Sequence, residues 1–302
     1  MPADITALFA RRPPRRPLLL DAAMGSALIA RGLARGRPPE AWNLERPEVV
    51  EAVHAHHLAA GSEVIQTNTF GGNELVLATH GLTTKMEALN RAGVRIARRA
   101  AEAAGGIPRI VAGSMGPSGE LLAPAGSADP DVLTEVFAGQ AATLESAGAD
   151  MLAVETMTDL REALCALRGA LSATGLPVTV CLNFERNEQG FFTLMGDRLE
   201  GAVARLADAG ATAVGANCSG GSEALLEATP GLVRASPVPV IVKPSAGLPE
   251  VSEEGLVYRQ DPQAFARDLA AAGRLGAAAV GGCCGTDHRF VAALAAQLAL
   301  VD

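Results

Sequence analysis

Eight short apolar runs alternate with eight helix-like segments along this chain, and that alternation constrains the fold more than any other feature of the sequence. The runs are LLLDAAM (18–24), EVIQTNTF (63–70), RIVAGSM (109–115), DMLAVET (150–156), VTVCLNF (178–184), TAVGANCS (212–219), PVIVKPSA (239–246) and AAAVGGCC (277–284). The helix-like segments have a hydrophobic period near 3.6 and cover roughly 47–60, 84–104, 130–147, 158–173, 197–209, 221–232, 261–272 and 287–299. Strict alternation predicts parallel strands joined by right-handed crossovers. Eight such units predict a single (β/α)8 TIM barrel, with a doubly wound open sheet as the alternative.

Composition limits the function classes that remain. No linker or low-complexity segment divides the sequence, so we expect one domain over residues 1–302. A net charge of −8 and an aromatic content of 3% argue against a nucleic-acid partner, because such sites need basic and stacking side chains. No apolar run reaches the roughly 20 residues of a membrane span, and Asp21 interrupts the apolar stretch at 18–30. We therefore expect a soluble cytoplasmic protein with no membrane partner.

Polar residues follow the predicted strands, at the points where the strands end. In a TIM barrel the active site lies at the carboxyl ends of the strands, whereas the interior is filled mainly by apolar side chains. The polar residues at these ends are Asp21, Thr67, Asn68, Thr69, Ser114, Glu155, Thr156, Asn183, Asn217, Cys218, Lys243, Ser245, Cys283 and Cys284. The sequence therefore predicts an active site at this rim.

Three of these residues are cysteines, and they indicate a metal site. Cys218 ends the sixth run, and Cys283 and Cys284 end the eighth, 65 residues later. Three thiolates that meet at one rim would hold zinc and leave its fourth position open, as in catalytic zinc sites. The alternatives are small buried hydrophobic side chains and a vicinal disulfide, which a reducing cytosol disfavours. Cys165 and Cys181, inside a helix-like segment and a strand, are expected to be core residues.

Two further local patterns lead to expectations about the backbone and about a helix. Adjacent side chains of a strand point to opposite faces, so Cys283 and Cys284 can share one metal only if the strand breaks and turns between them. The glycines in GGCCGT (281–286) would permit that break. His54 and His57 lie three residues apart in a helix-like segment, and we interpret them as part of a solvated helix face rather than as metal ligands.

Together these motifs resemble the homocysteine S-methyltransferase family. The resemblance extends from LLLDAAMGSALIARG (18–32) to GGCCGT and is most specific at GANC (215–218) and GGCCGT. Supporting pieces are QTNTF (66–70), GSMGPSGELL (113–122), ETMTDLREA (155–163) and KPSAGLP (243–249). Within the family the chain looks most similar to the homocysteine-binding module of cobalamin-dependent methionine synthase. The sequence departs from the family pattern at Ala22, where glycine is usual, and at Ser245, where many members have asparagine.

The resemblance implies a (β/α)8 barrel, a zinc ion on Cys218, Cys283 and Cys284, and methyl transfer to the thiol of homocysteine to give methionine. It also implies that Asp21 and Glu155 help to hold the amino group of homocysteine. Backbone amides of the first loop are plausible partners for its carboxylate. The expected substrate-binding residues are Asp21, Ala23, Met24, Gly25, Ser26, Asn68, Glu155 and Asn183.

The methyl donor implied by the same resemblance is a methylated corrinoid, a cobalamin carried by a separate protein. Betaine, S-methylmethionine and S-adenosylmethionine are the alternative donors. Another thiol or a selenol is the alternative acceptor, and a zinc-binding or corrinoid-docking subunit without turnover is the alternative outside the enzymes.

Overall fold

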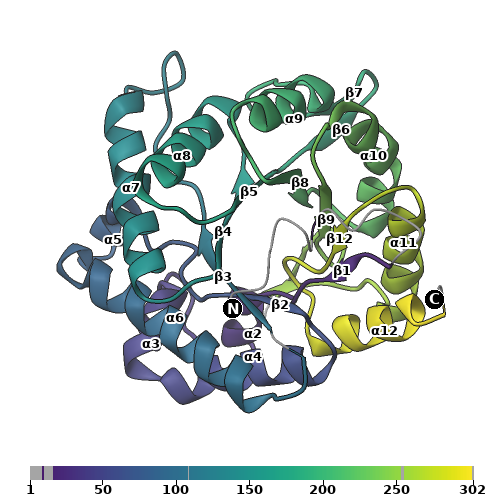
Figure 1. The fold of residues 1–302 in the computed structure, drawn as a ribbon, viewed down its shortest axis with the longest axis horizontal. Helices are drawn as coiled ribbons and strands as arrows, with labels where there is room; N and C mark the ends of the chain where they lie inside the picture. The colour runs from purple at the N-terminus through teal and green to yellow at the C-terminus, as the bar shows by residue number, and fades with distance from the viewer. Residues whose placement is uncertain (1–8, 10–15, 108, 253–254, 301–302) are drawn as a thin grey trace.

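The computed structural model describes Phe9 and residues 16–107, 109–252 and 255–300. Within these residues eight parallel strands form one sheet in the order β1-β12-β9-β8-β5-β4-β3-β2 (Figure 1). The strands are β1 (Leu18–Leu19), β2 (Val64–Gln66), β3 (Ile110–Met115), β4 (Met151–Met157), β5 (Val178–Leu182), β8 (Ala213–Cys218), β9 (Val240–Pro244) and β12 (Ala279–Val280). A parallel bridge between Leu20 and Val64 joins β1 to β2 and closes the ring. The (β/α)8 TIM barrel is therefore confirmed, and the open sheet is excluded.

Helices surround the ring of strands, as the alternation predicts (Figure 1). They are α4 (Pro47–Ala59), α6 (Met86–Ala103), α7 (Pro130–Ser146), α8 (Leu160–Ala173), α9 (Leu199–Asp208), α10 (Ser222–Ala235), α11 (Pro262–Arg274) and α12 (His288–Leu298). Four begin at an aspartate whose carboxylate accepts a hydrogen bond from a backbone N–H of the first turn, which satisfies a donor that the helix itself leaves free. These four caps are Asp129, Asp159, Asp261 and Asp287.

Shorter elements are inserted after the carboxyl ends of several strands. The short helices are α2 (Met24–Ile29), η1 (Pro39–Ala41), α3 (Trp42–Glu45), α5 (Glu74–Thr79) and η2 (Thr83–Lys85). Two hairpins, β6 (Glu185–Asn187) with β7 (Gly190–Phe192) and β10 (Glu250–Ser252) with β11 (Gly255–Val257), follow β5 and β9. These insertions enlarge the rim at which the polar strand ends lie.

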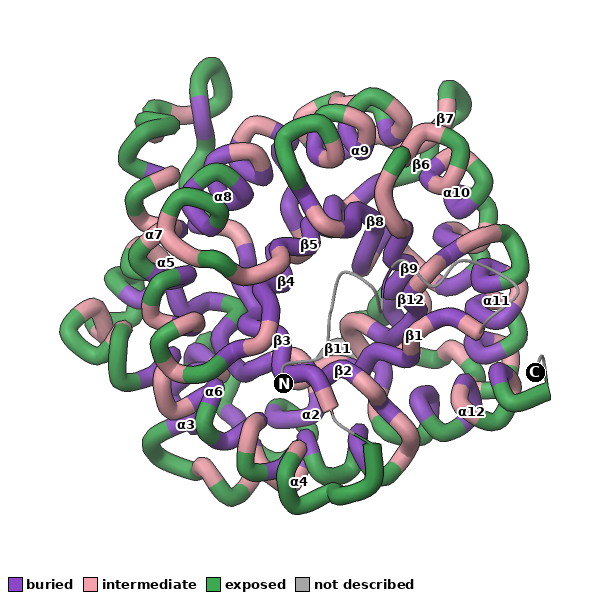
Figure 2. The backbone as a smooth tube through the Cα atoms, in the orientation of Figure 1, coloured by how far each residue is buried: buried purple, intermediate pink, exposed green. Residues whose placement is uncertain are grey.

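The core has two layers, and Figure 2 shows buried residues along the strands and on the sides of the helices nearest to them. The larger layer lies between strands and helices and contains Leu, Val, Ala and Phe side chains. The smaller layer fills the barrel interior with Phe9, Leu20, Ile110, Met151 and Ile241 among others. The interior is therefore closed by apolar side chains below the rim, and polar groups are left for its carboxyl end.

The burial of four side chains tests two predictions made from the sequence. Cys165 and Cys181 are buried, as predicted for core residues. The interpretation of His54 and His57 as part of a solvated face was wrong, because both side chains are buried on the inner side of α4. Among the described residues no helix is both long and apolar enough to cross a bilayer.

Candidate active site

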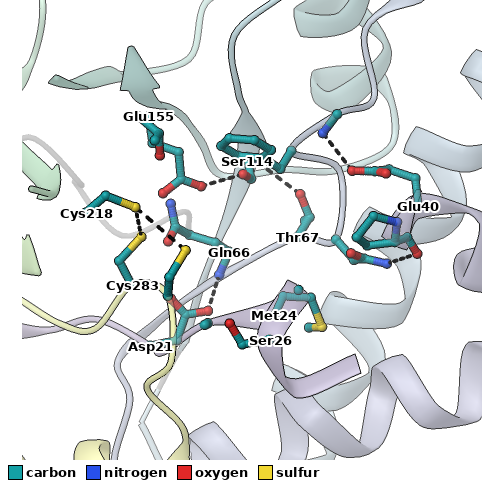
Figure 3. Close-up of a pocket in the computed structure, with 18 of the residues that line it drawn as sticks. Asp21, Met24, Ser26, Glu40, Gln66, Thr67, Ser114, Glu155, Cys218 and Cys283 are labelled. Atoms are coloured by element: carbon teal, nitrogen blue, oxygen red, sulfur yellow. Dashed lines mark hydrogen bonds between the residues drawn. The ribbon is translucent and has the colours of Figure 1, made fainter. Parts of the chain in front are cut away.

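A cavity of about 340 Å³ opens at the carboxyl ends of the barrel strands. Of the residues predicted for the site it is lined by Asp21, Ala23, Met24, Gly25, Ser26, Asn68, Glu155, Cys218, Cys283 and Cys284. Asn183 follows β5 and is not among the lining residues. Figure 3 shows Cys218 and Cys283 at one side of the cavity and Glu40 at the opposite side. The volume is suited to a small organic molecule.

The three cysteines that the sequence singles out meet at one wall of this cavity. The Sγ atom of Cys218 lies 2.9 Å from that of Cys283 and 3.7 Å from that of Cys284. All three sulfur atoms lie within 4.8 Å of one another, and none forms a disulfide. Within the described part of the chain this is the only convergent group of three or more His, Cys, Asp or Glu ligand atoms.

Irregular backbone at the ends of two strands brings these sulfurs together. Cys218 has φ +61°, in the left-handed region that residues other than glycine rarely adopt. Strand β12 ends at Val280, and Cys283 and Cys284 lie in a turn that precedes α12. Gly285 has φ +77°, and a Cβ atom there would lie 2.1 Å from the ring of Tyr258. The last strand does break, but it ends before both cysteines and not between them as the sequence predicted. Gly285 is required by both conformation and space.

The chemistry of this donor set fits a zinc ion. Zinc–sulfur bonds of ~2.3 Å in a tetrahedron place sulfurs ~3.8 Å apart. Cys218 and Cys284 are 3.7 Å apart, whereas Cys218 and Cys283, at 2.9 Å, would have to separate to hold the ion. The hydrogen bond with Cys218, together with burial, raises the pKa of Cys283 to about 12. Three such thiols remain neutral at pH 7 unless a cation lies among them. The cavity beside them leaves space for a fourth ligand.

A buried cluster of charges lies beside the cysteines. The Nζ atom of Lys243 is 3.5 Å from Oδ1 of Asp21 and 3.6 Å from Oε2 of Glu155. The remaining oxygens are held by the protein, because Oδ2 of Asp21 accepts the N–H of Gln66 at 2.7 Å and Oε1 of Glu155 accepts the hydroxyl of Ser114 at 2.6 Å. The two carboxylates that the resemblance assigns to substrate are thus joined by one lysine.

The electrostatics of this cluster follow from its burial. Burial raises the pKa of Asp21 to about 6, although Lys243 and the N–H of Gln66 act in the opposite direction. Burial lowers the pKa of Lys243, but Glu155 and Asp21 outweigh it and the pKa is raised overall. Lys243 is therefore a permanent cation at neutral pH, and it neutralises one of the two carboxylate charges.

Asn217, the third residue of GANC, connects the cysteines to β4. It is fully buried, and its Oδ1 accepts the N–H of Thr156 at 2.7 Å while its Nδ2 donates to the hydroxyl of Thr156 at 2.7 Å. The same Nδ2 lies 3.6 Å from Sγ of Cys283. Thr156 has φ +62°, a strained conformation that these bonds hold in place. Asn217 therefore fixes the end of β4 relative to a sulfur of the triad.

The first loop and Asn68 contribute differently to the cavity wall. Helix α2 begins at Met24, so the N–H groups of Met24, Gly25 and Ser26 have no carbonyl partner within the helix. The N–H of Ala23 lies 3.3 Å from Oγ1 of Thr286. The side-chain amide of Asn68 donates to Pro39 O at 2.8 Å and to Asn43 Oδ1 at 2.9 Å, and it fixes the loop that bears η1.

Several polar residues of the cavity were not assigned to the site from the sequence, and Lys243, Gln66 and Glu40 are the ones that bear on its charges. Lys243 was recognised only as a polar strand end, yet it is one of just two lysines among 25 Lys and Arg residues, which is a usable signal. Gln66 holds Asp21 through its backbone. Glu40 is buried and accepts the N–H of Gly71 at 2.6 Å, and burial raises the pKa of Glu40. Nothing in the local sequence marks Glu40, because it lies in an inserted loop.

Comparison with known proteins agrees with this geometry. The family model described as homocysteine S-methyltransferase matches residues 18–298. Methionine synthases of Mycobacterium tuberculosis and Mycobacterium leprae are each 32% identical over an alignment of 297 residues, and the matches cover 94% of this chain but 25% and 24% of those proteins. The chain thus spans about a quarter of the length of these relatives.

Solved structures show the same relationship over a full chain. The metallated form of the Escherichia coli homocysteine methyltransferase MmuM is 27% identical, with a TM-score of 0.79, and the match covers 96% of this chain and 98% of that one. The carboxyl transferase domain of Rhizobium etli pyruvate carboxylase, at 14% identity and a TM-score of 0.54, shares the fold alone. The matched family model, which spans nearly the whole barrel, shows that the chain belongs to the homocysteine S-methyltransferase family.

Proposed function

We propose that this protein transfers a methyl group to the thiol of homocysteine, giving methionine, with zinc held by Cys218, Cys283 and Cys284. The observation that carries the proposal is the convergence of three sulfurs within 4.8 Å at the wall of an open cavity. In the reaction a sulfur–methyl bond forms, the bond between methyl and donor breaks, and the thiol proton leaves to solvent. The metallated relative MmuM supports the presence of a metal.

The main chemical requirement is an ionised acceptor sulfur. An alkyl thiol has a pKa of ~8.5, so only a few per cent is thiolate at pH 7. Zinc, when bound, would supply the positive charge that keeps the acceptor thiol ionised at neutral pH. Full ionisation is worth about 10- to 50-fold, or ~2 kcal/mol, so most of the acceleration must come from orientation of the sulfur and methyl group.

The protein's own groups provide that orientation. Met24, Gly25 and Ser26 line the cavity at the start of α2, and we propose that their backbone N–H groups bind the carboxylate of homocysteine. The amino group then lies on the side of Asp21 and Glu155, which carry the negative charge of the cavity. Asn217 contacts both Thr156 at the end of β4 and the sulfur of Cys283, and it fixes their relative positions. With the carboxylate and sulfur both held, the chain of homocysteine is fixed at its two ends.

We further propose that the methyl donor is a methylated corrinoid carried by a separate protein, located like this one in the cytoplasm. The cavity is too small for a corrinoid, so such a donor would have to dock over the rim. The loops after β2, β3 and β9 expose the apolar side chains of Phe70, Leu121, Leu248 and Val251. The relatives named methionine synthase support methionine as the product of the transfer.

Metal analysis of cysteine variants tests the zinc assignment. Cys218→Ala, Cys283→Ala and Cys284→Ala should each lose stoichiometric zinc and methyl transfer together. Cys181→Ala is the matched control, because it removes a buried thiol of the barrel interior and should keep both. Turnover by a zinc-free Cys283→Ala protein would exclude the proposed mechanism.

A donor screen with homocysteine tests the reaction. The zinc-loaded protein is incubated with methylcobalamin, S-methylmethionine, S-adenosylmethionine or betaine, and methionine is measured. Methionine from methylcobalamin supports the corrinoid donor, and methionine from another donor alone replaces it. Stoichiometric zinc without methionine from any donor would favour a non-catalytic zinc subunit.

A further inference from the structure

Polar side chains from β8 and from the end of β9 contact two of the cysteine sulfurs. The Nδ2 atom of Asn217 lies 3.6 Å from Sγ of Cys283, and the hydroxyl of Ser245 forms a hydrogen bond with the side chain of Cys218. Asn217 and Ser245 are both buried. The backbone N–H of Ser245 also donates to the carbonyl of Cys218 at 3.1 Å, which holds Ser245 beside that cysteine.

Tyr258 provides a hydroxyl for the third sulfur. It is the only tyrosine of the chain, and it directly follows β11. Its ring lies against Gly285, where a Cβ atom would be 2.1 Å from Cγ of the ring, and its hydroxyl forms a hydrogen bond with the side chain of Cys284. Tyr258 is not among the residues that line the cavity, so it contacts Cys284 from another side. Each sulfur of the triad thus has a polar partner from a different element.

These partners bear on the reaction because a cysteine thiolate is itself a nucleophile. An ionised sulfur has no proton to donate, so the amide and the two hydroxyls act as the donors toward it. A hydrogen bond to an ionised group is stronger than one between neutral groups, and it stabilises the negative charge on the sulfur. A sulfur stabilised in this way is less reactive toward an electrophilic methyl carbon. The acceptor thiol enters from the cavity, away from these three donors.

We infer that Ser245 and Tyr258, together with Asn217, are positioning residues that direct the methyl group to the acceptor by making the cysteine sulfurs poorer nucleophiles. The inference rests on the proposed function, because it concerns the choice between sulfurs in the same methyl transfer. In the productive step the acceptor sulfur bonds to the methyl carbon, the bond from carbon to donor breaks, and the thiol proton leaves to solvent. A cysteine that reacted instead would become a neutral thioether, and the site would lose an anionic ligand.

Alkylation of the zinc-loaded protein with iodoacetamide tests each sulfur separately. A thiolate bonds to the methylene carbon, iodide leaves, and mass spectrometry with fragmentation identifies the modified cysteine. Tyr258→Phe keeps the ring against Gly285 but removes the hydroxyl, so Cys284 should react faster by about threefold or more. Ser245→Ala should accelerate Cys218 by a similar factor. Each variant should leave the sulfur of the other pair at its wild-type rate.

Ser62→Ala is the matched control. Ser62 is fully buried like Ser245, but it precedes β2 at the amino end of the barrel, so its removal should change neither alkylation rate. All rates are compared at full zinc occupancy, and zinc affinity is measured by competition with a chelator. We expect the affinity to fall by about tenfold in Tyr258→Phe and in Ser245→Ala. Weaker zinc binding without faster alkylation of the paired sulfur would show a merely structural role and overturn the inference.

Failure of the proposed function gives a different result. If no donor yields methionine from homocysteine, the methyltransferase assignment fails, whereas the alkylation rates of the zinc-loaded protein still test the three donors. Methionine formation with equal alkylation rates in all variants would have the reverse meaning. Because each hydroxyl is paired with its own sulfur, one pair still provides the test if the variant of the other does not fold. The two conclusions can therefore be refuted separately.

Discussion

Two buried histidines should make this protein sensitive to acid. His54 and His57 are both buried on α4, and neither ring nitrogen of His54 has a hydrogen-bond partner among the described residues. Burial lowers the pKa of His54 to about 4. Burial, together with the neighbouring His54, lowers the pKa of His57 to about 3. Both rings are therefore neutral in the folded protein at every pH at which it is expected to work.

The sign and size of the effect follow from proton linkage. A histidine in the unfolded chain titrates near 6.5, so below that pH the unfolded state binds more protons and the free energy of unfolding falls. Between pH 7 and 4.5 each of the two histidines should lower it by about 2 to 3 kcal/mol. Asp21 acts in the opposite direction. Its pKa is raised to about 6, so it stabilises the folded state by about 2 kcal/mol over the same interval.

A comparison of variants separates these contributions. Urea unfolding of wild type and of His57→Leu is measured at pH 7 and at pH 4.5. Because leucine cannot bind a proton, the stability of His57→Leu relative to wild type should rise by about 2 to 3 kcal/mol at the lower pH. His56→Leu, which removes an exposed histidine of the same helix, is the control and should not show this change. An equal difference between His57→Leu and wild type at both pH values would refute the reasoning.

Substitutions at three positions in or beside the cavity wall test how that wall is held. Asn217→Ala should lower the free energy of unfolding by about 1 to 3 kcal/mol, because the N–H of Thr156 loses its partner, and urea unfolding measures this; no loss would contradict that role. Glu40→Gln should be milder than Glu40→Ala in the same assay, since glutamine still accepts a hydrogen bond; equal losses would argue against the bond. Gly285→Ala should displace Tyr258 and lower the content of the zinc that we propose for the three cysteines, and unchanged metal content would contradict this.

Much of the fold was predictable because the relevant signals are repeated and local. The predicted helix limits differ from the observed ones by a few residues at most, for instance 130–147 against α7 at Pro130–Ser146. The inserted elements were not predicted. Helix α2 has six residues and the hairpin strands have three each, too short for a hydrophobic period to be visible. The interpretation of His54 and His57 failed for a related reason, since a polar residue at a buried helix position looks the same in sequence as an exposed one.

The sequence predicted which residues lie at the site, but it did not predict which of them contact one another. The rule that polar residues at strand ends face the active site correctly placed Asp21, Glu155 and the cysteines on the cavity. It could not show that Lys243 reaches across the barrel to both acids, because the direction of a long side chain depends on which strands are opposite each other. Glu40 was missed because it comes from an insertion and not from a strand.

The GGCC segment (281–284) can be recognised in the sequence, although the path of its backbone can be seen only in the structure. A Cβ atom on Gly281 would lie 2.6 Å from Cβ of Leu20, so this residue must be glycine for β12 to pack against β1 and close the barrel. The chain then leaves the sheet, the N–H of Cys283 bonds to Pro244 O at 2.7 Å, and both cysteines turn toward β8. Closure of the ring and convergence of the sulfurs therefore depend on the same short segment. A substitution at Gly281 should consequently disturb folding and metal binding together, whereas one at Cys284 should affect the metal site and leave the barrel intact.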